Sequence, residues 1–486
     1  MKIRSLLLGS VAAAGLGTAA YAADPLGETL TALGVCDALG ISGLTISSDT
    51  VCLQLSGGVD YRLRYGDFRG NANVGTTYDG NVDPFIADAA ANGANLDWDT
   101  RSRAWLKVVA TSDTDMGAAS AIFGIRQVDE WRVRNEGFSS LVNGLPGAVA
   151  GGDHTNGFMA DEAYVKIGDA TVLMMGLRQR GIAGSVANVG DDAPYSYLFI
   201  SEKIDGGGVL IDNDDRRFGG HSIQGVADLG NGVSVALGLE NIATAGDVAG
   251  ASNRFLVDGG GPTGVGRDSN LQSGRTGAGN AGTAVGVISY AGEGVTAHVT
   301  GVAFGVLDGV VDSYAVHAGA TGTFDIVTIR GAVGYENNWE NSGFNVLHAL
   351  GSAQLTFDIF KIALSGEAAN FNGFTDYSVG GKLSADVVDG VTLNLDGSYF
   401  WDDSLGVSST RVQGDISAAV TENITLTAAI GAFFGPGVVV PSGDNNLIYG
   451  RVGVGYNPGG GFTAGANLEV NDEGGWRTEV TGSKTF

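Results

Sequence analysis

Residues 52–66 read CLQLSGGVDYRLRYG, and two kinds of side chain alternate along this stretch. Apolar residues and tyrosines occupy most odd positions from Leu53 to Tyr65, whereas the even positions include one aspartate and two arginines. A period of two is that of a β-strand with two different faces. One apolar face and one charged face suit a wall with lipid on one side and water on the other. The stretch therefore predicts a strand of an all-β, transmembrane antiparallel β-barrel.

The same alternation recurs to the C-terminus and predicts a series of β-hairpins. Tight turns such as Gly230-Asn231-Gly232 and Asp389-Gly390 alternate with much longer connections. The long connections cover about residues 67–98, 133–157, 179–215 and 241–282. Short turns at one end and long outer loops at the other are typical of outer-membrane barrels, and we count about 20 strand-like segments. The last strand ends at Phe486, and its pairing with the first strand would close the barrel and remove the sheet edges.

The N-terminus predicts an exported chain. Lys2 and Arg4 precede an apolar run, and Ala20-Tyr21-Ala22 has the small-residue pattern of a signal-peptide cleavage site. The expected division is a signal peptide, a periplasmic N-terminal segment and a β-barrel pore domain over residues 1–22, 23–51 and 52–486.

Two cysteines, Cys36 and Cys52, are present in this exported chain. An oxidising compartment and an even cysteine count favour a disulfide between them. Such a bond would tie the segment before the barrel to the base of the first strand.

Composition limits the classes of function. The formal net charge of −26 argues against a nucleic-acid partner, because phosphates would be repelled. The mean hydropathy of +0.12 is high for an acidic soluble protein, but a barrel with lipid-facing strands accounts for it. We find no catalytic motif and expect neither an enzyme nor a cofactor. Residues 212–215 (DNDD) could bind Ca²⁺, but they lack the spacing of a full calcium loop, so a solvated acidic turn is favoured.

Several motifs resemble those of a known family. CDALG at residues 36–40, CLQLSG at 52–57 and EAYVKI at 162–167 are similar to segments of the alphaproteobacterial (rhizobial-type) outer-membrane porins. The resemblance implies a homotrimer in the outer membrane of a Gram-negative bacterium, in contact with lipid and lipopolysaccharide. It also implies a water-filled channel for passive diffusion of small hydrophilic solutes and ions. A constriction loop, here about residues 179–215, would fold into a barrel of about 16 strands, fewer than our own count.

A pore depends on the charges at its narrowest point rather than on a catalytic group. The inward parity of the early strands predicts a basic wall, made of Arg62, Arg64, Arg101, Arg103, Lys107, Arg126, Lys166, Arg178 and Arg180. The expected constriction loop supplies the acids Asp191, Asp192, Glu202, Asp205, Asp212, Asp214 and Asp215. We predict that these acids face the basic wall and create a transverse field. The alternative is that the acids lie on a solvated outer loop and the arginines pair with carboxylates of neighbouring strands.

The histidines do not indicate a metal site, and two functions other than a general porin remain as alternatives. The five histidines show no metal-ligand spacing, and we expect His298 and His317 to be wall residues rather than ligands, so no metal is predicted. A substrate-selective channel would use aromatic residues such as Tyr195, Tyr197 and Phe199 as a sliding path. A secreted glycine-rich β-solenoid or adhesin shares the composition, but a solenoid needs a short regular repeat, which we do not find.

Overall fold

The computed structural model describes most of the strands and parts of the connections. The described residues are 36, 44–48, 50–68, 70–71, 85–87, 96–133, 141–142, 145–146, 152–189, 217–242, 282–309, 311, 313–338, 343, 345–371 and 373–486. The predicted signal peptide and most of each predicted long loop lie outside them.

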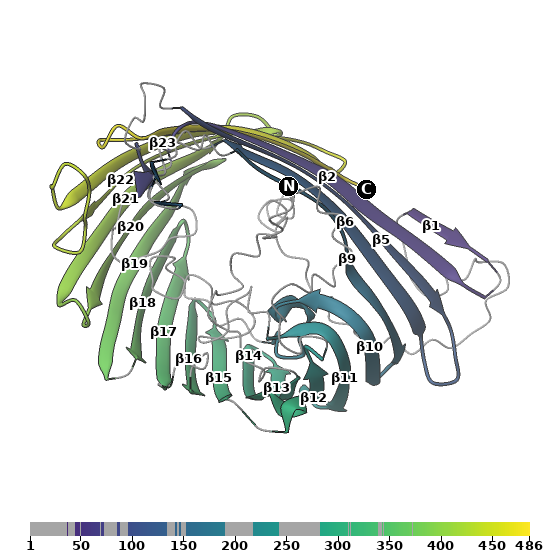
Figure 1. The fold of residues 1–486 in the computed structure, drawn as a ribbon. Coiled ribbons are helices and arrows are strands. Elements are labelled where there is room, and N and C mark those ends of the chain that lie inside the picture. Colours follow the sequence, from purple (N-terminus) through teal and green to yellow (C-terminus); the bar gives the residue numbers. More distant parts are fainter. Residues whose placement is uncertain are drawn as a thin grey trace.

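Within the described residues, twenty antiparallel strands form one closed barrel (Figure 1). These strands are β2 (Cys52–Asp67), β5 (Asp97–Ser112), β6 (Ala119–Val133), β9 (Gly152–Gly168), β10 (Thr171–Arg180), β11 (Gly219–Gly230), β12 (Val233–Glu240), β13 (Thr283–Gly292), β14 (Val295–Phe304), β15 (Ser313–Phe324), β16 (Val327–Asn337), β17 (Val346–Phe357), β18 (Phe360–Phe371), β19 (Phe374–Val388), β20 (Val391–Asp402), β21 (Val407–Ala419), β22 (Ile424–Phe434), β23 (Asn446–Gly459), β24 (Phe462–Asn471) and β25 (Trp476–Thr485). Each strand pairs with the next, and β2 pairs with β25 to close the ring. The sequence-based count of about 20 strands is confirmed, whereas the count of about 16 implied by the resemblance is too low. A closed ring of hairpins also excludes a β-solenoid.

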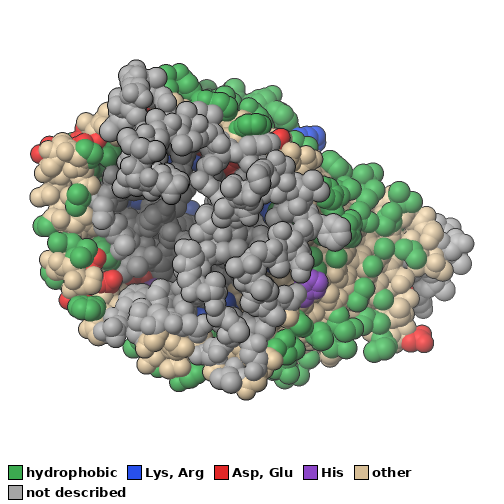
Figure 2. Space-filling view, viewed as in Figure 1, with side chains coloured by type: hydrophobic (Ala, Val, Ile, Leu, Met, Phe, Trp, Pro, Cys, Tyr) green, Lys and Arg blue, Asp and Glu red, His purple; other side chains and the backbone are tan. Residues whose placement is uncertain are grey.

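Exposure alternates along the strands as the sequence pattern predicts. On β2, Val59 and Tyr61 are 52% and 46% exposed, whereas Asp60 and Arg62, at the alternate positions, point to the interior and pair with charged neighbours. The same alternation puts hydrophobic side chains over the part of the outer wall turned to the viewer in Figure 2. The wall therefore has an apolar outer face and a largely polar inner face.

The turns at one end of the barrel are short. Asn231 (φ 54°) and Gly232 (φ 80°) form the two-residue turn between β11 and β12. A positive φ at both central residues gives a turn whose twist matches that of the flanking strands, and asparagine followed by glycine favours it. The opposite end carries the longer connections, such as the one that follows β10.

A short strand outside the ring, β1 (Leu44–Ser47), extends the wall beside the base of β2. β1 pairs with Cys52–Leu55, whereas β25 pairs with Gly58–Asp67 along the same edge of β2. Between them, Gly57 and Phe486 exchange two backbone hydrogen bonds. The predicted disulfide between Cys36 and Cys52 is confirmed, and it anchors the chain that precedes β1. Figure 1 shows β1 beside the projecting end of β2.

Three smaller features complete the described part of the chain. The two-residue strands β3 (Gly70–Asn71) and β4 (Phe85–Ile86) pair with each other, as do β7 (Leu141–Val142) and β8 (Leu145–Pro146). Two 3₁₀ turns, η1 (Ile182–Gly184) and η2 (Val306–Asp308), follow β10 and β14. Among the residues that the structure describes, no helix has the length and apolar character needed to cross a membrane.

Candidate pore interior

Charges of opposite sign lie close together on the inner faces of β2, β5 and β6. Arg62 lies opposite Arg101 in the strand pairing, and like charges in that position destabilise a sheet. Carboxylates compensate for this repulsion. The Arg62 Nη2 lies 3.7 Å from Asp99 Oδ1 and 3.5 Å from Glu130 Oε1, and the Arg101 Nη2 lies 3.7 Å from Asp60 Oδ1.

Two shorter contacts continue this pattern. The Arg103 Nε donates to Asp60 Oδ2 at 2.6 Å, so Asp60 contacts two arginines of β5. The Arg64 Nε donates to Glu479 Oε2 at 2.6 Å across the junction between β2 and β25. The second contact joins residues from the two ends of the barrel sequence.

A β-bulge brings two consecutive carboxylates of β9 to the inner face. The pairing of β6 with β9 passes from Gly124 opposite Glu162 to Ile125 opposite Ala160, so Asp161 is the extra residue. Asp161 Oδ1 lies 3.0 Å from the Arg126 Nη2. Glu162 Oε2 accepts a hydrogen bond of 2.9 Å from Lys107 Nζ. Without the bulge, strict alternation would place one of the two acids on the lipid side.

The predicted basic wall is therefore a wall of mixed charge. Six of its nine residues form ion pairs with carboxylates of the wall, namely Arg62, Arg64, Arg101, Arg103, Lys107 and Arg126. This is the pairing that the alternative interpretation of the sequence anticipated. The partners were not predicted individually because they depend on the strand register.

The other three predicted basic residues lie on β9 and β10. The Arg178 guanidinium lies 4.5 Å from the centre of the Tyr164 ring. Lys166 lies opposite Ser120 in the pairing of β6 with β9, and Arg180 ends β10.

The seven predicted constriction-loop acids and the three aromatic residues of the sliding path lie outside the described residues. Their predicted position opposite the basic residues stays a prediction. The described beginning of the same loop, residues 181–189, can be placed.

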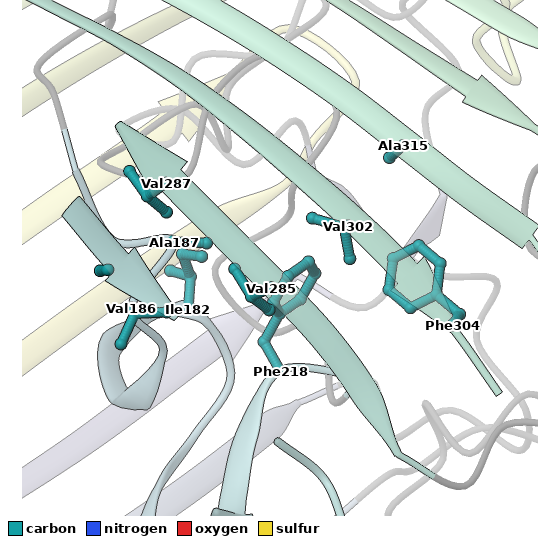
Figure 3. Packing of buried hydrophobic residues seen from close by; sticks show 10 residues of the cluster. Ile182, Val186, Ala187, Phe218, Val285, Val287, Val302, Phe304 and Ala315 are labelled. Atoms are coloured by element: carbon teal, nitrogen blue, oxygen red, sulfur yellow. The ribbon is translucent and has the colours of Figure 1, made fainter. Parts of the chain in front are cut away.

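Residues 181–189 pack on the inner face of the barrel (Figure 3). Ile182 and Ala187 are only 2% and 1% exposed, and they pack in one cluster with Val285 and Val287 of β13. Inner-face residues of β12, β14 and β15 complete the cluster, together with Phe218 at the return of the loop. Ile288, next to Val287, is 61% exposed on the opposite face, which identifies the cluster as interior. The chain after β10 thus turns inward and occupies part of the barrel cross-section.

One buried carboxylate fixes this inward segment. Glu240, at the end of β12, is fully buried, and its Oε1 accepts hydrogen bonds from Val186 N (2.9 Å) and Gln224 Nε2 (2.8 Å). Its Oε2 accepts a bond of 2.9 Å from Gly219 N. Gln224 Nε2 also donates to the Gly184 carbonyl at 2.8 Å. Three donors satisfy the carboxylate that burial has removed from water.

A second buried pair fixes the returning end of the loop. The Arg217 Nη1 donates to Glu336 Oε1 at 2.6 Å, and its guanidinium lies 4.0 Å from the centre of the Phe304 ring. Thr283 Oγ1 donates to the Arg217 carbonyl at 2.6 Å. Sequence reasoning missed both anchors, because only the inward parity of Glu240 and Glu336 hinted at them.

A second cluster covers the inner face of β22 and β23. Ile86 of β4 packs with Val438, Phe433 and Leu447, so a part of the connection after β2 reaches the opposite end of the sequence. Beneath them, the fully buried Arg411 donates from Nε to Tyr449 Oη at 2.9 Å and from Nη2 to Gln413 Oε1 at 2.7 Å. The sequence did not predict this cluster.

An apolar outer face, a charged inner face and a closed ring of strands define a transmembrane β-barrel of the outer-membrane type. No family model matches the chain. A putative outer membrane protein of Sinorhizobium fredii is 26% identical over 238 residues, which cover 46% of this chain and 60% of that protein. Porin Omp2b of Brucella melitensis is 29% identical over 176 residues, which cover 35% of this chain and 40% of the porin.

The matched region spans less than two thirds of each relative. These relatives confirm the resemblance to alphaproteobacterial outer-membrane porins that the sequence motifs indicated. Among solved structures, a mutant of the Rh. blastica porin is 12% identical and covers 89% of this chain and 100% of its own, with a TM-score of 0.34. A TM-score this low adds nothing to the fold that the strand pairing establishes.

Proposed function

We propose that this chain is an outer-membrane porin, through which small hydrophilic solutes and ions diffuse passively along a water-filled channel. This proposal rests on the closed wall of twenty strands, which has an apolar outer face and a charged inner face. Ion pairs such as Arg103 with Asp60 keep partly exposed charges on the inside, where water has to solvate them. The name of the Brucella relative, a porin, supports the same function.

Aromatic side chains at both ends of the strands support the membrane location. Tyr377 and Trp401 stack at the long-loop end of β19 and β20, with ring centres 6.5 Å apart. Phe357 and Phe360 meet at the short-turn end of β17 and β18, with ring centres 5.7 Å apart. Aromatic rings concentrate at the two interfaces of a membrane barrel. We infer the outer membrane of a Gram-negative bacterium as the location.

The proposal includes a homotrimer and no catalytic activity. Both relatives carry the names of membrane or channel proteins, and the sequence motifs imply a trimeric assembly. Chemical cross-linking of the detergent-extracted chain should give a ladder that ends at three copies. A ladder that ends at one copy would contradict the trimer and leave the pore function intact.

Single-channel recording in a planar bilayer tests the pore. We expect the purified, folded chain to give stepwise openings, in groups of three if the trimer forms. The reversal potential under a salt gradient reports the net charge that passing ions meet. Heat-denatured chain is the control. Folded chain that inserts but conducts no current would contradict the proposal.

A further inference from the structure

Strand pairing gathers two histidines on the inner wall. His298 lies on β14 and His317 on β15, on the face that also bears the buried Thr300 and Val302. The two histidines are 19 residues apart in sequence and lie on different strands, so no short metal-binding motif marks them in the sequence. The β14–β15 register puts Thr300 opposite His317 and makes the two imidazoles diagonal neighbours.

The two rings are close and buried. His298 Nε2 and His317 Nδ1 lie 3.0 Å apart, and the ring centres are separated by 4.7 Å. The residues are 5% and 2% exposed. A hydrogen bond between two neutral imidazoles uses one lone pair and one proton, so these two nitrogens face each other across a short gap.

This separation matches two adjacent ligands of one metal ion. With metal–nitrogen distances of about 2.0–2.1 Å, a nitrogen–nitrogen separation of 3.0 Å corresponds to an angle of about 91–97° at the metal. That angle is close to the edge of a square-planar or octahedral site. Imidazole nitrogens in square-planar or tetragonal geometry select Cu²⁺ or Ni²⁺.

A neighbouring hydroxyl supports a bound group at this point. Thr300 is fully buried, and its Oγ1 has no hydrogen-bond partner among the residues that the structure describes. An unsatisfied buried hydroxyl costs about 1–3 kcal/mol, and native structures use such groups where water or an ion completes the bonding. A metal-bound water would donate a hydrogen bond to this oxygen.

We propose that His298 and His317 bind one Cu²⁺ or Ni²⁺ ion through Nε2 and Nδ1, on the inner wall of the barrel. On coordination, the proton shared by the two rings moves to the other nitrogen of the imidazole that carried it, and water fills the remaining positions on the metal. In the described part of the chain no group of three or more His, Cys, Asp or Glu side chains could hold a metal, and the proposed site uses these two imidazoles. The site is independent of the proposed porin function.

Copper titration of the full-length, folded chain in detergent tests the site. We expect one Cu²⁺ per chain, with an electron paramagnetic resonance signal that shows two coupled histidine nitrogens. His298→Gln and His317→Gln should each weaken binding at least about tenfold, because the loss of even an outer-shell partner costs that much. His221→Gln, a change to an exposed histidine of β11, is the matched control and should leave the affinity unchanged.

Unchanged copper affinity in the His298→Gln and His317→Gln variants, with each shown to be folded by its heat-dependent gel shift, would overturn the site. If both variants fail to fold, wild-type chain with ¹⁵N-labelled histidine decides the question. Two ¹⁵N couplings to the bound Cu²⁺ support the proposal, and one or none overturns it. Copper binding of unchanged affinity in a folded variant that carries both His298→Gln and His317→Gln would likewise overturn it.

Discussion

At the scale of single residues, carboxylates decide how the interior is organised. The buried Glu240 carboxylate accepts hydrogen bonds from two backbone amides and one side-chain amide, and the Asp60 carboxylate forms ion pairs with two arginines. The first contact holds an inward segment against the wall. The second neutralises a charged face that borders the channel. Two substitutions separate these roles.

Glu240→Gln keeps the volume and removes the charge. An amide group must then face a backbone N–H, either that of Val186 or that of Gly219, so one donor loses its acceptor. We expect a loss of about 1–3 kcal/mol in the free energy of unfolding, the cost of an unsatisfied buried group. Urea unfolding of the refolded barrel measures it, with the exposed Glu293→Gln as control. Equal unfolding midpoints for the two variants would show that Glu240 does not fix the segment.

Asp60→Asn leaves Arg101 and Arg103 without their shared carboxylate. The inner wall gains one positive charge, so the reversal potential in a salt gradient should move toward anion preference. Stability should change by less than about 1 kcal/mol, because these side chains are partly exposed and screened by water. Asp389→Asn, in an exposed turn, is the control. A shift toward cations would contradict the placement of this pair in the conduction path.

At the scale of elements, period-two patterns predicted the strands well and their partners poorly. The alternation in residues 52–66 fixes which side chains of β2 point inward, because neighbours along a strand alternate. It carries no information on register, and Arg64 pairs with Glu479, which lies 415 positions further along the chain. The bulge at Asp161 was equally hidden, since one extra residue reverses the parity of everything that follows.

The N-terminal elements give a prediction of their own. The disulfide links residues 16 positions apart and holds the chain next to β1, outside the closed ring. Cys36→Ser with Cys52→Ser should lower the free energy of unfolding by about 2–4 kcal/mol, the usual effect of a disulfide. The barrel should still close, because β2 and β25 pair beyond this point. The heat-dependent gel shift reports closure, and its loss would show that closure requires the disulfide.

At the scale of the whole molecule, two inward-packed clusters reduce the space inside a wide ring. Barrel diameter grows with strand number, so a ring of this size would leave a broad passage if nothing entered it. One cluster lies on β12–β15, and the other lies on β22 and β23. The sequence predicted that residues 179–215 would enter the barrel, and the described start of that segment does so. It did not predict the second cluster, whose contacts join the beginning and the end of the barrel sequence.

Replacing residues 182–216 with a short glycine-serine linker should widen the channel. The described residues 182–189 occupy the inner wall, so their removal frees cross-section and exposes Val285 and Val287 to water. We expect a larger single-channel conductance and a lower unfolding midpoint. A folded variant with unchanged conductance would place the narrowest point away from this segment.

The junction between β2 and β25 also constrains the order of assembly. Its contacts join residues more than 400 positions apart, such as Arg64 and Glu479, so the loop-closure entropy of the whole barrel opposes their formation. By contrast, β1 and β2 are sequence neighbours, and a covalent bond can hold them together before any other strand is in place. Contacts of such different range form at different speeds. One part of this edge of β2 can therefore be paired with β1 from the start, whereas the rest of the same edge stays open until the last strand, β25, has been made.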